Sequence, residues 1–290
     1  MFESSSNFSI DNSQFVLKCP TERPLHGIRE LCNQTIHEAA HDARARDPPP
    51  QCDRELRKGE ISTILSSVDE DPNPLVWVKG GAGVGKTAIA QACAEILEKR
   101  RRRFAAFFFS KEVRMNHRQF FLTVAYQLAT QYPEYQVLLD TKICQDPSLL
   151  EHKTMASQFK RLIADPWEEL ERAGRGIREC VPIIVDALDE CDGGIAQAIL
   201  KIVVGTDEDK AHKFRWIFFS RPETGIEAAF SLGNVSFLHL QSAAVRDDVS
   251  APLALPPAPT KAAFSPQRLI NQTRRDPIKI QRERPMRESL

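Results

Sequence analysis

The feature that most constrains the fold is one glycine-rich run, Gly80-Gly81-Ala82-Gly83-Val84-Gly85-Lys86-Thr87, which fits G-x-x-x-x-G-K-[ST] at every fixed position. The apolar run Leu75–Lys79 precedes it, and a helix-forming run to about Lys99 follows. Glycines allow successive N–H groups to turn inward around an anion, and the start of the next helix adds the positive end of its dipole. The sequence therefore predicts a phosphate-binding loop between a strand and a helix. Lys86 is expected to reach the β- and γ-phosphates of a nucleotide, and the Thr87 hydroxyl is expected to ligate Mg²⁺.

An apolar run that ends in acidic residues supplies the second part of the expected site. Val181–Val185 has the composition of a buried strand, and it is followed by Asp186, Asp189 and Glu190. At the carboxyl end of a strand beside a phosphate loop, Asp186 is expected to hold Mg²⁺ through its water shell. Glu190 is the better candidate to polarise the attacking water, and Asp189 either assists at the metal or orients its neighbours. The alternative is a strand that leaves the core into a solvated acidic turn.

A third apolar run, Phe214–Ser220, is followed by Arg221 and a proline. A strand here would deliver Arg221 close to the γ-phosphate, where its guanidinium could sense whether a third phosphate is present. A solvent-facing arginine before the proline that ends the strand is the alternative. The strand ends together predict catalytic roles for Glu190, Asp189 and Arg221.

Apolar runs alternate with amphipathic runs through most of the chain. The runs typical of buried strands are Leu75–Lys79, Phe104–Ser110, Val181–Val185, Phe214–Ser220 and Val235–Leu240. The runs typical of helices are 25–46, 54–67, 87–99, 118–131, 155–164 and 195–204, and prolines at 48–50 end the first of them. This alternation predicts an α/β fold with a mainly parallel sheet, helices on both faces and additional N-terminal helices. Residues 249–290 are proline-rich and basic without apolar periodicity, so we expect them to be disordered.

The overall composition limits the other partners of the chain. Lys plus Arg number 39 and Asp plus Glu number 39, so the net charge favours neither nucleic acid nor a membrane surface. No run approaches the roughly 20 apolar residues of a membrane-spanning helix, and the N-terminus lacks the pattern of a secretory signal. The scattered cysteines never form C-x-x-C, which is typical of reduced thiols. We therefore expect a cytoplasmic protein with no nucleic-acid or membrane partner.

Two further patterns have a functional and a structural interpretation. His37-Glu38-Ala39-Ala40-His41 matches H-E-x-x-H, in which two histidines on one helical face bind zinc. A third ligand would have to come from beyond the triple proline, so a surface helix is favoured. Lys99–Arg103 is a basic run that could contact nucleic acid, but cations at the end of a helix also complement its dipole. The solvated interpretation is favoured because no aromatic residue is interleaved.

Several segments in this order resemble the NACHT-type signalling NTPases that are abundant in fungi. They are VWVKGGAGVGKTAIAQ, FAAFFFS, AYQLA, VPIIVDALDECDG and IFFSRPE, and the earlier stretch HDARARDPPPQCDRELRK resembles the segment that leads into the phosphate loop of that group. The resemblance runs from about residue 37 to about residue 248. It implies a molecular switch in which nucleotide exchange and hydrolysis gate self-association and a downstream response.

The resemblance also assigns roles to residues of this chain. The phosphate-loop roles fall on Gly80, Gly85, Lys86 and Thr87, the acidic motif on Asp186, Asp189 and Glu190, and the sensor at a strand end on Arg221. Family members usually carry an effector domain before the NTPase, and a helical lid and winged helix after it. Because the similar run ends near residue 248, we expect the winged-helix histidine that contacts the β-phosphate to be missing.

These observations predict four parts and one main function. The parts are a flexible polar segment (1–35), a helical lead-in (36–73), a NACHT-type P-loop NTPase domain (74–248) and the disordered tail (249–290). The expected function is binding and slow hydrolysis of ATP or GTP with Mg²⁺, as the switch module of a signalling protein that self-associates or binds related NACHT proteins. The chain lacks N-K-x-D, which disfavours a regulatory GTPase. A non-catalytic nucleotide-binding module that acts on full-length relatives is the alternative.

Overall fold

Five parallel strands form the central sheet of the computed structural model, which describes residues 25–110, 118–176, 179–191, 194–205 and 213–241 and the backbone of 281–282. The strands are β1 (Leu75–Lys79), β2 (Ala105–Phe108), β3 (Val181–Asp186), β4 (Phe214–Ser220) and β5 (Val235–His239). A two-residue strand, β6 (Gln281–Arg282), pairs antiparallel with β5, and the order across the sheet is β2-β3-β4-β1-β5-β6. Every residue of β2, β3 and β4 is buried, as expected of a sheet covered on both faces. The predicted α/β fold is confirmed.

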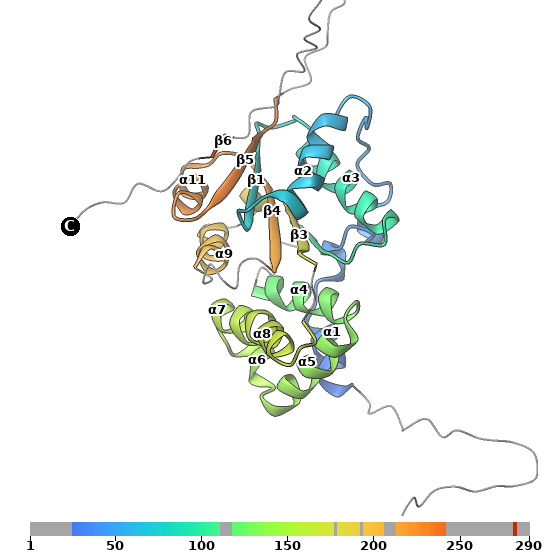
Figure 1. Cartoon of the computed structure of the whole chain (residues 1–290), viewed down its shortest axis with the longest axis vertical. Helices are drawn as coiled ribbons and strands as arrows, with labels where there is room; N and C mark the ends of the chain where they lie inside the picture. The colour runs from blue at the N-terminus through green and yellow to red at the C-terminus, as the bar shows by residue number, and fades with distance from the viewer. Residues whose placement is uncertain are drawn as a thin grey trace, which may run out of the picture.

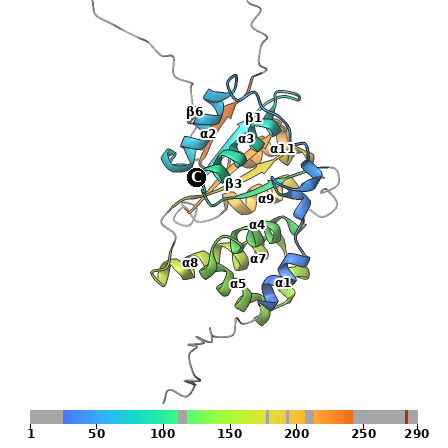
Figure 2. The same cartoon turned by 90° about the vertical axis from the view of Figure 1, so that its right-hand side faces the viewer.

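Helices cover both faces of the sheet, and successive strand residues alternate between them. One face packs against α2 (Lys58–Glu70) and α3 (Lys86–Lys99). The other face packs against α4 (Phe120–Ala129), α9 (Ile195–Val204) and α11 (Thr224–Phe230). In β3, Ile184 lies in the core on the α3 side and Val185 in the core on the α4 side. Because the sides alternate, the next residue, Asp186, faces α3. Figure 2 shows the sheet between these two layers of helices.

A lobe of helices extends the α4 side of the molecule, as the lower part of Figure 1 shows. It contains α1 (His26–Asn33), α5 (Pro133–Gln145), α6 (Ser148–Glu151), α7 (Met155–Gln158), a π-helical turn, η4 (Phe159–Ala164), and α8 (Asp165–Arg172). The backbone N–H of Ile28 in α1 donates to Oδ1 of Asp140 in α5, at 3.1 Å. The lobe therefore combines α1, near the start of the described residues, with helices that lie about a hundred residues later in the sequence.

The lead-in connects this lobe to the phosphate loop along the α3 side of β2. In place of the rest of the helix predicted over 25–46, its first part contains two 3₁₀ turns, η1 (His37–Ala39) and η2 (Arg44–Arg46), and α2 follows them. Its backbone groups form hydrogen bonds with side chains of α4 and α3. The Ile36 N–H donates to the hydroxyl of Thr123 in α4 (3.0 Å), and the His41 carbonyl accepts from the side-chain amide of Gln91 in α3 (3.0 Å). The prediction of a continuous helix over 25–46 is wrong beyond Asn33, because these long-range hydrogen bonds replace helical ones.

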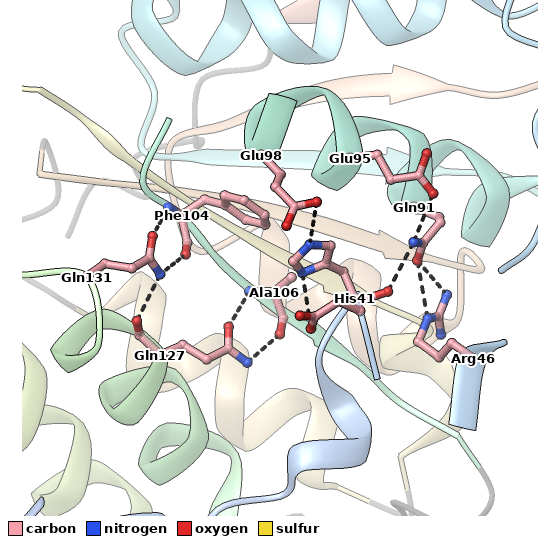
Figure 3. Close-up of polar contacts among 10 residues, drawn as sticks. His41, Arg46, Gln91, Glu95, Glu98, Phe104, Ala106, Gln127 and Gln131 are labelled. Atoms are coloured by element: carbon pink, nitrogen blue, oxygen red, sulfur yellow. Dashed lines mark hydrogen bonds and ion pairs between the residues drawn. The ribbon is translucent and has the colours of Figure 1, made fainter. Parts of the chain in front are cut away.

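Gln127 of α4 and Gln131, which lies just after the end of α4, hydrogen-bond the free edge of the sheet at and before β2 (Figure 3). The side-chain amide of Gln127 accepts from the Ala106 N–H and donates to the Ala106 carbonyl, both at 2.8 Å. Gln131 does the same for Phe104, at 3.1 and 2.7 Å. Two glutamines four residues apart, one in α4 and one after it, thus pair with Ala106 of β2 and with Phe104, which immediately precedes β2. The side chains take the place of a neighbouring strand, which protects the sheet edge from pairing with another chain.

The other predicted elements agree with the structure in most places. The strands over 75–79 and 214–220 and the helix over 195–204 have the predicted bounds, and the strand over 181–185 extends by one residue to Asp186. The lead-in helix predicted over 54–67 lies at 58–70, while α5, α6, α8 and α11 were not predicted. Helix α1 lies inside the segment 1–35, which we expected to be flexible. The helix is packed on the rest of the protein because its Leu31 side chain is fully buried in the core. The expected disorder of 249–290 falls outside the described residues, apart from the backbone of β6.

Candidate functional site

The phosphate loop joins the end of β1 to the first turn of α3, as its pattern predicts. Gly85 has a φ of 88°, a left-handed conformation that favours glycine. Gly80 is constrained by packing, because a Cβ there would lie 2.8 Å from Cγ2 of Val84 and 3.0 Å from the Leu240 carbonyl. The first and last glycines of the pattern are therefore required for different physical reasons.

Lys86 lies over the loop that precedes it. Its ammonium donates to the carbonyls of Gly80 (2.9 Å) and Gly81 (2.7 Å). Burial lowers the pKa of Lys86, and the nearby Arg221 lowers it further, whereas the charges of Asp189 and Asp186 raise it. The structure therefore brings the lysine of the loop within electrostatic reach of two of the three predicted acidic residues, Asp186 and Asp189.

Asp186 ends β3 with its side chain almost completely buried, at 1% exposure. Burial raises the pKa of this carboxyl group to about 6, while a hydrogen bond with the Thr87 side chain and the charge of Arg46 oppose the rise. Oδ1 has no hydrogen-bond partner within the described residues. A buried carboxylate oxygen without a partner is costly unless a cation or a proton compensates it. The pair of Asp186 and Thr87 supplies the hard oxygen ligands that Mg²⁺ prefers, so the residues present fit the predicted metal.

Asp189 and Arg221 join the ends of β3 and β4. The backbone N–H of Arg221 donates to Oδ1 of Asp189 at 3.0 Å, and its Nε lies 3.2 Å from Oδ2. The Asp189 side chain is only 6% exposed, whereas that of Arg221 is 53% exposed. Both carboxylate oxygens of Asp189 are therefore engaged by Arg221, which supports the orienting role of Asp189 over a role at the metal.

The turn after Asp186 has an unusual backbone. Ala187 has a φ of 56°, in the left-handed region that residues with a Cβ rarely adopt, and the 3₁₀ turn η5 (Leu188–Glu190) follows it. Strained conformations of this kind persist where the surrounding structure imposes them, and they cluster at functional sites. The turn places Asp189 against Arg221 and ends at Glu190, which is half-buried.

Arg46 borders the site and was not predicted from the sequence. Its guanidinium carbon lies 3.8 Å from the centroid of the Phe108 ring, and its Nε and Nη2 donate to Oε1 of Gln91, each at 3.2 Å (Figure 3). Phe108 is the register partner of Asp186, so the charge of Arg46 acts on that carboxylate from the β2 side. Desolvation lowers the pKa of Arg46, and Asp186 raises it. No local pattern in the lead-in distinguishes this arginine from its neighbours, because only the fold brings it to Asp186.

The two weaker patterns lie away from the phosphate loop. His37 is in η1, with its Nε2 3.7 Å from Sγ of Cys32, while Nε2 of His41 lies 3.6 Å from Glu98 (Figure 3 shows the second pair). The histidines are not on one α-helical face, and no group of three or more candidate metal ligands occurs among the described residues. In the basic run, Arg102 donates to Asp69 (2.7 Å) and to the Cys180 carbonyl (2.8 Å). The surface helix expected over the first pattern is not formed, because His37 lies in a 3₁₀ turn and His41 follows it. In the basic run, Arg102 is paired and only 22% exposed instead of fully solvated. Within the described residues, no helix has the length and apolar character that crossing a membrane requires.

Comparison with known families gives one match. The family described as Nephrocystin 3, N-terminal, a NACHT-related region, matches residues 52–221, which is 170 of the 290 residues. The matched region contains the phosphate loop, Asp186, Asp189 and Arg221. No curated protein matches the chain.

Proposed function

The chain belongs to the nephrocystin 3 N-terminal family, and on this basis we propose that it binds a nucleoside triphosphate with Mg²⁺ and hydrolyses it slowly. ATP is preferred over GTP in this proposal because the sequence lacks N-K-x-D. The binding and hydrolysis would serve as the switch of a NACHT-type signalling protein, in which the triphosphate favours self-association or association with related proteins.

The observation that carries the proposal is the meeting of Thr87 and Asp186. Two motifs about a hundred residues apart in the sequence bring the Thr87 side chain and the buried Asp186 carboxylate together at the carboxyl edge of the sheet, where Thr87 lowers the pKa of that carboxyl group. In open α/β sheets, ligands bind at this edge. An ionisable group with a perturbed pKa beside a glycine-rich loop is a functional-site signature with a physical cause.

Each residue of the site has a chemical task in this proposal. The loop N–H groups and Lys86 would hold the phosphates, while Thr87 and Asp186 would hold Mg²⁺. The metal would neutralise charge on the phosphate oxygens. Glu190 would orient the attacking water and accept its proton as the bond between the γ-phosphorus and the bridging oxygen breaks. Arg221, held by Asp189, would contact the γ-phosphate.

Phosphate release from ATP and Mg²⁺ by the purified chain tests the proposal. We expect slow release above the buffer blank, and no release from Lys86→Ala. Binding of ATP without release would identify the chain as a non-catalytic nucleotide-binding module. If the parent neither binds nor hydrolyses the nucleotide, the proposed function is wrong.

Self-association is tested separately by light scattering of the purified chain with ATP, with ADP and without nucleotide. The proposal expects a larger mass with ATP and Mg²⁺ than with ADP. Equal masses in all three conditions would argue against a switch that acts through self-association.

A further inference from the structure

Arg57 of the lead-in contacts the phosphate loop directly. Its Nη2 donates to the Val84 carbonyl at 3.0 Å and to the Gln241 carbonyl at 3.1 Å, while its Nη1 donates to Glu60 at 2.9 Å. The side chain is only 12% exposed. One guanidinium thus joins three segments that are remote in the sequence: the lead-in, the loop and the segment that follows β5.

The contact with Val84 matters because of how such a loop binds an anion. Phosphate binding needs the loop N–H groups to point inward and the carbonyl oxygens, which carry partial negative charge, to point away. Lys86 takes the carbonyls of Gly80 and Gly81, and Arg57 takes that of Val84. Two cations of the chain therefore hold three carbonyls of the loop.

The peptide unit between Val84 and Gly85 is one that can turn over. Reversal of a peptide unit changes ψ of the first residue and φ of the second, and glycine tolerates both signs of φ. At Gly85 the observed φ is 88°. A reversed unit would turn the Val84 carbonyl toward the phosphates and the Gly85 N–H away from them. The hydrogen bond from Arg57 opposes this reversal.

Arg57 is itself held in place by fixed partners. Leu240, which precedes Gln241, donates its N–H to the Lys79 carbonyl at 2.8 Å, so the second carbonyl bound by Arg57 is anchored to β1. Glu60, in the first turn of α2, holds the guanidinium from the other side. The planar guanidinium fork can serve two carbonyls and a carboxylate at once, which an ammonium group cannot do with the same geometry.

We propose that Arg57 is a positioning residue of the phosphate loop, which fixes the Val84–Gly85 peptide unit in the orientation that binds a nucleoside triphosphate. The choice of ligand rests on the proposed function, whereas the effect on the loop does not. Arg57 is not required to contact the nucleotide for this role.

The test compares Arg57→Ala and Arg57→Lys with the control Arg54→Ala. Arg54 lies in the same lead-in and is paired with Glu95, but its side chain is 48% exposed and its partner lies on α3. Titration of ATP with Mg²⁺ should show roughly 10- to 100-fold weaker binding in Arg57→Ala, the usual effect of losing charge-assisted hydrogen bonds. Arg57→Lys should recover part of the affinity, and Arg54→Ala should bind like the parent. Equal affinity of Arg57→Ala and the parent would overturn the proposal.

Amide NMR of Gly83 and Gly85 without nucleotide gives a readout that does not depend on the proposed function. The parent and Arg54→Ala should each show one set of sharp signals, and Arg57→Ala should show doubled or exchange-broadened signals on the microsecond-to-millisecond timescale. If Arg57→Ala does not fold, the same comparison is made with Arg57→Lys, which should show broadening. Unchanged loop signals in the folded variant would refute the positioning role. If the parent binds no nucleotide but the signals change as expected, the proposed function fails while the role of Arg57 in the loop stands.

Discussion

Replacement of Asp186 by Asn should stabilise the protein against unfolding while it destroys the site. In the folded protein the pKa of Asp186 is raised from 3.8 to about 6, mainly by burial. The protonated form is therefore the one that folding favours. Any stability that this group contributes is fully present below the unfolded pKa of 3.8 and is lost as the pH rises through about 6.

The size of the effect follows from the shift in pKa. One pKa unit corresponds to about 1.4 kcal/mol, so the ionised carboxylate costs the folded protein about 3 kcal/mol above pH 6. An asparagine resembles the protonated acid and keeps an acceptor for the Thr87 hydroxyl. The free energy of unfolding of Asp186→Asn should match that of the parent near pH 4 and exceed it by about 2 to 3 kcal/mol near pH 7.5.

Urea unfolding from about pH 4 to about pH 8 without Mg²⁺ or nucleotide measures this difference. Asp189→Asn is the matched control, because its carboxylate is paired with Arg221 instead of being left with an unpartnered oxygen. The control should lose up to about 1 kcal/mol near neutral pH. If Asp186→Asn is no more stable than the parent at neutral pH, or if the difference does not change with pH, the account of Asp186 as a buried, uncompensated carboxylate is wrong.

Three further substitutions test other parts of the structure. Lys86→Ala should abolish tight binding of ATP, because the charged contact with phosphate is lost, and calorimetry that gives the parent affinity would exclude the phosphate-loop assignment. Glu190→Gln should bind ATP normally and release phosphate roughly 100-fold more slowly, whereas unchanged turnover would move the catalytic role to Asp189. Gln127→Ala should lower the free energy of unfolding by about 2 to 4 kcal/mol, because the N–H and carbonyl of buried Ala106 lose their partner. A loss below about 0.5 kcal/mol in urea unfolding would mean that water or another chain replaces the amide at the edge of β2.

The parts of the site that could be predicted are those encoded by local patterns. The phosphate loop, its flanking strand and helix, and the acidic end of β3 each lie within a short continuous run whose residue types follow from backbone geometry and strand burial. The positions of Asp186 and Arg221 followed from a general property of parallel sheets, in which the carboxyl ends of the strands share one edge.

The lead-in could not be predicted because its contacts are long-range. Arg46 and Arg57 are single basic residues in a segment with several others, and only their partners on α3 and the phosphate loop distinguish them. The helical spacing over 25–46 suggested one helix. Hydrogen bonds of the backbone with the Thr123 and Gln91 side chains instead stabilise a non-helical path with two 3₁₀ turns after α1. The hydrogen bonds from Gln127 and Gln131 to the edge of the sheet likewise could not be predicted, because two glutamines four residues apart have the spacing of any exposed helical pair.

Isothermal titration calorimetry of the purified chain with ATP, with and without Mg²⁺, tests the central claim most directly. The account predicts saturable binding with one ATP per chain, tighter with Mg²⁺ than without it, and its loss in both Lys86→Ala and Asp186→Asn when Mg²⁺ is present. Heats that equal dilution for the folded parent, or the same affinity in the parent and Lys86→Ala, would contradict it.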